Sequence, residues 1–150
     1  MAEMTQALTE QLALMGVVSP QLIDNNTADT AWIDMSKVRR VIFILALGAT
    51  DIVVDFKLRS ATAAAGTNAA DITGKVITQF TATDDNKQAI IEIRADELGA
   101  IGAGRQWVSG RVTVGDGTLG GNVCVVALAG VGRNEPTSDY DLASVAQIIR

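Results

Sequence analysis

The chain has 150 residues and a net charge of −5, and it contains one cysteine and no histidine. Its length suits one domain with a sizeable core. The missing histidine excludes histidine-dependent catalysis, and the lone Cys124 excludes an internal disulfide and a thiolate zinc cluster. We therefore expect a single domain, residues 1–150, that is held together by packing and binds no metal or other cofactor.

The acidic balance of the chain argues against a nucleic-acid-binding surface, which concentrates Lys and Arg. The basic residues are scattered along the sequence, and the adjacent Arg39 and Arg40 lead directly into the apolar run 41–49. This setting favours the start of a core strand, with a local phosphate contact as the alternative. The run is shorter than the roughly 18–20 residues that span a membrane, and the N-terminus lacks the basic residues of a secretory signal. We expect no direct contact with nucleic acid or with a membrane.

Residues 1–15 predict an N-terminal helix or arm. Apolar side chains recur there at spacings of four, four and three residues, which places them on one helical face: Met4, Leu8, Leu12 and Met15. A helix of about three turns is marginal alone. It must therefore dock, either on its own domain or on a neighbour.

From Gly16 onward, short segments rich in Val, Ile, Thr and Phe alternate with Gly, Asp and Asn. This texture is typical of an all-β sandwich or barrel. The predicted strands are Val17–Ile23, Ala31–Asp34, Val38–Leu47, Asp51–Arg59, Ile72–Thr81, Gln88–Arg94, Gln106–Val114 and Asn122–Val131.

Four of these strands carry further expectations. In Asp51–Arg59, every second residue from Ile52 to Leu58 is apolar and faces the core. Val38–Leu47 is predicted to be more fully buried, and the compact connection 48–51 predicts an antiparallel hairpin between these two strands. Gln106–Val114 has one dry face and one wet face, the latter with Trp107, Ser109 and Arg111. Cys124, in the last strand, is expected to be a small buried hydrophobe.

Two segments outside the strands have local signals. Residues 95–100 predict one helical turn that ends at a glycine. Residues 133–150 are predicted to form a C-terminal arm, because the chain becomes polar after Val131. A weak capping pattern at 138–141 fits either a short helix or an extended arm. Neither end of the chain is expected to belong to the sandwich core.

The motifs that resemble catalytic or ligand sites have simpler structural explanations. Gly115, Gly117 and Gly120 match a phosphate-binding pattern that needs a following helix, whereas a strand follows here, so we expect a hairpin turn. The pairs Asp84–Asp85 and Asp139–Asp141 match no calcium loop, and the first suits a turn. No base stands near a Ser, Thr or Cys nucleophile. We expect no enzymatic activity and no catalytic, cofactor-binding or metal-binding residues.

Three segments together carry a family resemblance: residues 26–35, residues 71–75, and residues 85–88 with the following 90–98. They lie within residues 26–98, about half of the chain. Together they resemble β-sandwich decoration or cement (minor head) proteins of tailed bacteriophages. The resemblance implies a jelly-roll-like antiparallel sandwich of about eight strands on the capsid exterior, present in the host cytoplasm during assembly. It further implies self-association as a homodimer or homotrimer, and binding to the major capsid protein through loops and terminal arms.

The small-residue passage 60–74 suits close backbone approach to another subunit, and an ordinary flexible surface loop is the alternative. Tryptophan is enriched at interface hot spots, although a Trp on a strand also fits a core position or a sugar-stacking platform. The candidate interface residues are Trp32, Ala64, Gly66, Asn68, Trp107, Arg111 and Tyr140.

Three functions of different classes are therefore open. The leading hypothesis is a non-enzymatic virion protein that binds and stabilises the phage capsid. The second is a receptor- or glycan-binding module on a phage head or tail, which needs exposed aromatic side chains in a groove. The third is an enzyme that uses carboxylates alone, such as a glycosidase, which needs a carboxylate pair on facing strands.

Overall fold

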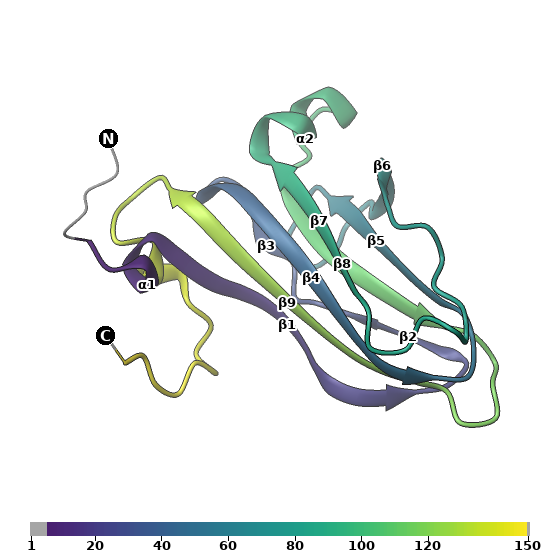
Figure 1. Cartoon of the computed structure of the whole chain (residues 1–150). Coiled ribbons are helices and arrows are strands. Elements are labelled where there is room, and N and C mark those ends of the chain that lie inside the picture. Colours follow the sequence, from purple (N-terminus) through teal and green to yellow (C-terminus); the bar gives the residue numbers. More distant parts are fainter. Residues whose placement is uncertain (1–5, 150) are drawn as a thin grey trace.

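The computed structural model describes residues 6–149, and within this range nine strands form two antiparallel sheets that pack face to face (Figure 1). Sheet A has the order β1 (Leu12–Ile23), β9 (Gly121–Gly132), β4 (Val38–Thr50) and β7 (Gln88–Arg94). Sheet B has the order β2 (Asn26–Asp29), β8 (Trp107–Val114), β5 (Val54–Ala61) and β6 (Ala70–Val76), with β3 (Ile33–Asp34) also paired to β8. The predicted all-β sandwich is confirmed.

The order of the strands is that of a jelly roll. The chain passes from one sheet to the other at most connections, and only β2–β3 and β5–β6 are consecutive within a sheet. Without the two-residue β3, the orders 1-9-4-7 and 2-8-5-6 give the two four-stranded sheets of an eight-stranded jelly roll.

The predicted hairpin between residues 38–47 and 51–59 is wrong. β4 pairs with β7 and β9, whereas β5 pairs with β6 and β8 in the other sheet. Crossing between sheets at residues 51–53 places the apolar faces of β4 and β5 opposite each other. Phe43 and Phe56 thereby meet over Gly110, where a Cβ would lie 2.9 Å from Phe43 Cδ1 and 3.1 Å from Phe56 Cε2. The missing side chain of Gly110 thus leaves the space in the core that the two phenylalanine rings occupy.

Some strand boundaries also differ from expectation. Ile72–Thr81 is a strand only as far as Val76, followed by one isolated bridge between Phe80 and Val54. Ala31–Asp34 shortens to β3, while β2 was not predicted, because its polar residues give no apolar alternation. Ser109 is buried rather than on a wet face, since Thr30 covers it and accepts the hydrogen bond from Ser109 Oγ at its carbonyl oxygen, 2.8 Å away.

The predicted N-terminal helix is much shorter than expected, and part of it belongs to the sandwich. Helix α1 covers only Leu8–Gln11, and Leu12 already pairs with Gly130 in sheet A. Pairing along β9 buries Ala13, which a three-turn isolated helix would leave exposed. Met4, the first residue of the predicted helical face, lies outside the described residues.

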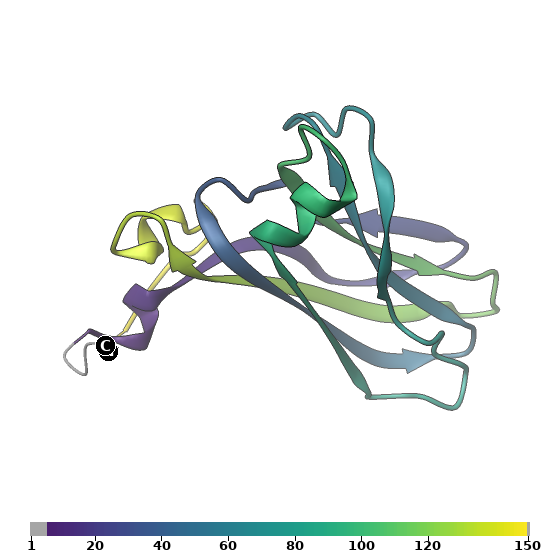
Figure 2. The ribbon, with the colours of Figure 1, turned by 90° about the horizontal axis from the view of Figure 1, so that it is seen from above.

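The C-terminal segment folds back onto the start of β1 as a 3₁₀ turn, η1 (Thr137–Tyr140), followed by an irregular stretch with a turn at residues 143–144. Leu14 donates its N–H to Asp141 Oδ1 at 2.6 Å and accepts the N–H of Leu142 at its carbonyl oxygen at 2.8 Å. Thr137 is completely buried. The two ends of the described chain thus lie together at one end of the sandwich (Figure 2).

The glycine-rich loop 115–120 is not a hairpin turn, because it connects β8 in sheet B with β9 in sheet A. Its backbone donors bind a carboxylate of the chain itself. Asp51 Oδ2 accepts the N–H groups of Thr118 and Leu119 at 2.8 Å each, and Oδ1 accepts that of Gly120 at 2.9 Å. These hydrogen bonds, that of Leu119 above all, lower the pKa of Asp51. The loop is therefore an internal anion site that Asp51 fills.

The helix predicted at residues 95–100 is longer than one turn, because it continues through Gly99 and ends at Ile101, before Gly102, whereas the turn predicted at Asp84 and Asp85 is confirmed. Helix α2 (Ala95–Ile101) begins where Glu97 Oε2 accepts the N–H of Arg94 at 2.7 Å. In the turn before β7, Asp84 accepts hydrogen bonds from Lys87 and from the N–H of Thr81, which lower its pKa to about 2.

Lys75 of β6 donates to the carbonyl oxygen of Glu92 at 2.7 Å and so occupies an acceptor of the edge strand β7.

The close packing at Gly110 gives a prediction with an internal control. Gly110→Ala should lower the free energy of unfolding by about 1–3 kcal/mol, because the added methyl group overpacks the two phenylalanines. Gly99→Ala should raise it by about 0.5–1 kcal/mol, because Gly99 is in α2 and a Cβ there meets no atom within 4 Å. Urea denaturation of both variants measures this, and equal effects would contradict the packing described.

The hydrogen bonds to Asp51 predict that the stability of the fold depends on pH. A carboxylate whose pKa is lowered on folding stabilises the fold above its unfolded pKa of about 3.9, and this stability is lost as the pH falls through the folded pKa. Asp51→Asn should therefore lower the Tm at neutral pH, and the difference from wild type should narrow as the medium is acidified below the unfolded pKa. Asp116→Asn, in the same loop, is the control and should have little effect at either pH.

Candidate functional site: the outer face of sheet A

The central strands of sheet A are apolar on both faces. In β4, Val41, Phe43 and Leu45 are completely buried, so Ile42 and Ile44 between them point away from the core. The same alternation in β9 buries Val125 and Ala127 and turns Val126 and Leu128 outward. An antiparallel sandwich usually has polar side chains on this outer side. Sheet A departs from that rule at its centre.

The strand register aligns these outward side chains in rows across the sheet. Ile44 is opposite Ile90 of β7 and Val126 of β9, and Val126 is opposite Val17 of β1. In the next row, Leu128 is opposite both Ile42 and Leu14. Ile90 is 65% exposed. We call this surface the apolar face; it comprises Leu14, Val17, Ile42, Ile44, Ile90, Val126 and Leu128.

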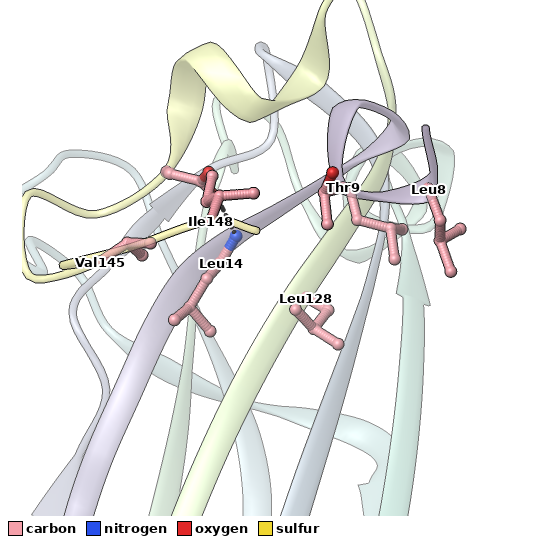
Figure 3. A pocket seen from close by; sticks show the side chains of 8 residues that line it. Leu8, Thr9, Leu14, Leu128, Val145 and Ile148 are labelled. Atoms are coloured by element: carbon pink, nitrogen blue, oxygen red, sulfur yellow. Dashed lines mark hydrogen bonds between the residues drawn. The ribbon is translucent and has the colours of Figure 1, made fainter. Parts of the chain in front are cut away.

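The apolar face continues into an open groove under the terminal segments. Figure 3 shows Leu14 and Leu128 on adjacent strands, with Leu8 and Thr9 of α1 on one side and Val145 of the C-terminal segment on the other. The groove has a volume of about 240 Å³. This terminal groove is lined by Leu8, Thr9, Leu12, Leu14, Leu128, Asp141, Val145 and Ile148.

The outer side of sheet B has the opposite character. Asp29 binds Arg111 through two hydrogen bonds, to Nε at 2.6 Å and to Nη2 at 2.7 Å, and this pairing raises the pKa of Arg111. Asp71 pairs with Lys57 at 2.6 Å and with Arg59 at 3.2 Å, and Lys57 above all lowers the pKa of Asp71. We call this surface the charged face. Its ion pairs are suited to contact with water.

Cys124 is partly exposed rather than buried, because it points outward from β9 beside the apolar face. Its register partner Ala46 in β4 is exposed. The prediction of burial was wrong because the apolar neighbours of Cys124 cover only one side of the strand.

The basic residues are not all scattered in space. Arg39, Arg40, Arg94 and Arg133 surround one open cavity, together with Ala95 and Asp96. The fold brings them together because β4 begins where β7 and β9 end.

Some of the predicted interface residues lie close together at one end of sheet B. Trp107 pairs with Ala61 and Asp34, next to the loop that carries Gly66. Gly66 has a φ of +79°, and a Cβ there would lie 2.7 Å from Trp32 Nε1, so the Trp32 ring packs on this glycine. Asn68 is exposed, and its carbonyl oxygen accepts a hydrogen bond from Arg105 Nη1 at 2.7 Å.

The other predicted interface residues lie elsewhere. Ala64 is exposed in the same loop as Gly66. Arg111 is on the charged face with Asp29, and Tyr140 is at the end with the chain termini, where its ring lies 5.7 Å from Lys37 Nζ. Contact of these residues with a partner remains a prediction.

The sequence contained a signal for the apolar face that we read differently. From the uninterrupted apolar runs 41–47 and 123–128 we predicted a more fully buried strand at Val38–Leu47 and burial of Cys124 within the second run. In a two-layer sandwich, however, a strand has only one side toward the interior. The second side of each run is the apolar face.

Two further observations concern residues 6–149. No three His, Cys, Asp or Glu side chains are grouped there in a way that would hold a metal ion. None of the helices in this range has the length and apolar character needed to cross a membrane.

Comparisons with known proteins give limited information. No protein-family model and no curated protein matches the chain. A solved structure with a similar arrangement is described as "Bacillus endospore appendages form a novel family of disulfide-linked pili"; it is 11% identical, with a TM-score of 0.45, and the match covers 87% of this chain and 99% of that chain. This similarity is too low to carry a functional argument.

The outward orientation of the apolar face can be tested through stability. Ile44→Thr should change the free energy of unfolding by less than about 1 kcal/mol, because only cross-strand contacts on the outer face are lost. Phe43→Ala, one residue away, should cost about 3–5 kcal/mol, because it opens a cavity in the core. Urea denaturation of both variants measures the difference, and a large loss for Ile44→Thr would contradict the orientation.

Proposed function

We propose that the protein is a non-enzymatic structural component of a tailed-bacteriophage virion, a decoration or cement protein that binds the major capsid protein on the capsid exterior. The observation that carries this proposal is the contrast between the two outer sides of the sandwich. One side is the apolar face, and the other is the charged face with its ion pairs. Such a molecule is suited to lie with one side on a protein surface and the other toward water.

The apolar face has the composition of an interface centre. Apolar area removed from water contributes about 25 cal/mol per Å², and the centres of protein interfaces are depleted in charge. Ile44 and Val126 lie in the middle of the face, with apolar register partners on both sides. Ile90 is exposed and the other six members of the face are partly exposed, and contiguous apolar surface that reaches solvent marks sites of protein association.

The phage assignment rests on the sequence resemblance of residues 26–35, 71–75 and 85–98. The jelly roll is compatible with it, since this architecture occurs in viral capsid proteins. The same architecture also occurs in lectins, so the fold alone assigns no function. We extend the proposal to the host cytoplasm as the site of synthesis, and to self-association as a homodimer or homotrimer on the shell.

Co-sedimentation with capsids assembled from the cognate major capsid protein tests the proposal. The wild-type protein should bind at a fixed, saturable stoichiometry. Ile44→Glu should weaken binding about 100-fold or more, because a carboxylate would be buried in the contact without a partner. The matched control is Thr73→Glu, which adds the same charge at an exposed position of β6 in sheet B and should bind like wild type.

Thermal melts of both variants verify that they are folded, and Ile44→Ser provides an uncharged second variant at the same position. Wild-type protein that does not sediment with shells would overturn the proposal. Unchanged binding of Ile44→Glu would overturn the role of the apolar face. In the first case, glycan binding through Trp32 and Trp107 becomes the next function to assay.

A further inference from the structure

The arginine pocket at one end of sheet A is the strongest cationic feature of the described chain. Arg39 and Arg40 are the second and third residues of β4, Arg94 ends β7, and Arg133 directly follows β9. Together they surround an open cavity of about 300 Å³. Four of the chain's 12 Lys and Arg residues thus gather at one place in a protein whose net charge is −5.

Carboxylates of the chain itself neutralise this pocket only in part. Arg40 lies 3.9 Å from Glu92, and Arg94 lies 3.3 Å from Asp96, and in both pairs each side chain is at least half exposed. Neither Arg39 nor Arg133 forms an ion pair with any residue between 6 and 149. Glu97, also nearby, is already bound by Lys75 and by the N–H of Arg94.

The strand register adds electrostatic repulsion between two of these arginines. Arg40 and Arg94 are direct partners across β4 and β7. Like charges at directly opposite positions of an antiparallel pair destabilise it. A bound anion between the guanidinium groups would remove this repulsion.

The pocket is continuous with the apolar face. The row that contains Arg40 and Arg94 is next to the row of Ile42 and Leu128 on the same outer side of sheet A. Protein interfaces combine an apolar centre with arginine at hot spots and with a polar rim. The guanidinium group also matches the geometry of a carboxylate, to which it donates two parallel hydrogen bonds.

We infer that the arginine pocket binds Asp or Glu side chains of an acidic segment on the partner protein that covers the apolar face. The inference rests on the proposed function, because it assumes that this side of sheet A lies against a protein. A nucleic acid fits less well, since the net negative charge of the chain repels a long polyanion.

Peptide binding to the purified full-length protein provides a first test that needs no capsid. The probe is a short fluorescein-labelled Glu-rich peptide, with a Gln-rich peptide of equal length and a single-stranded oligothymidine as comparisons, measured by fluorescence anisotropy. The Glu-rich peptide should bind, more weakly as salt is raised, and Arg39→Gln with Arg40→Gln should weaken it about tenfold or more. The control is Lys57→Gln with Lys87→Gln, which removes the same charge elsewhere and leaves Asp71 paired with Arg59.

The results separate this inference from the proposed function. Equal binding of the Glu-rich and Gln-rich peptides, preferential binding of the oligothymidine, or an equal loss in both double variants would overturn the inference. In the capsid assay, the Arg39→Gln and Arg40→Gln variant should bind more weakly than the Lys57→Gln and Lys87→Gln variant. Equal capsid binding would overturn the inference while the proposed function stands, and peptide binding without any capsid binding would overturn the proposed function alone.

Discussion

The alternation of side chains along β4 and β9 is the constraint on which the rest of the structure depends. Both strands lie in the middle of sheet A and have apolar side chains on both sides. One set, with Phe43 at its centre, closes the core against sheet B. A two-layer sandwich has a single interior. The other set therefore forms the outer surface of the sheet, where the terminal segments of the chain cover it only in part, at Leu14 and Leu128.

Carboxylates of the chain organise the irregular segments around the two sheets. Asp51 binds three backbone N–H groups of the glycine-rich loop, Asp85 accepts the N–H of Thr50 at 2.8 Å, and Asp141 accepts that of Leu14. Each supplies an acceptor to a backbone N–H in a loop or near the end of a strand, since a backbone donor away from water needs a partner. Several acidic residues that a search for catalytic pairs would select are thus structural.

The sequence predicted the class of fold because alternation and turn residues are local signals. The core face of β5 and the turn at Asp84 follow from such signals. The pairing partner of each strand does not follow from local signals. β4 and β5 are joined by a short connection, yet they lie in different sheets, and Phe43 and Phe56 both pack over Gly110 in the core between them. Residues 12–15 illustrate a second limit, since their helical spacing is overruled by pairing with β9, more than 100 residues away in the chain.

The candidate site was missed for a related reason. An uninterrupted apolar run such as 41–47 does not reveal whether its second side is covered by the chain or left exposed. That depends on how many layers the fold has, which no local pattern reports. The arginine pocket was missed because its members come from the ends of three strands that only the sheet order brings together.

The late position of β9 in the chain has a consequence for biosynthesis. Every complete row of the apolar face crosses β9, and within residues 6–149 β1 pairs with no other strand of sheet A. During translation β1 must therefore wait for residues 121–132 before it can pair, and the long sequence separation of this pairing favours slow folding. The apolar face is therefore assembled only after residue 132 has been synthesised, and a shorter nascent chain lacks its central rows.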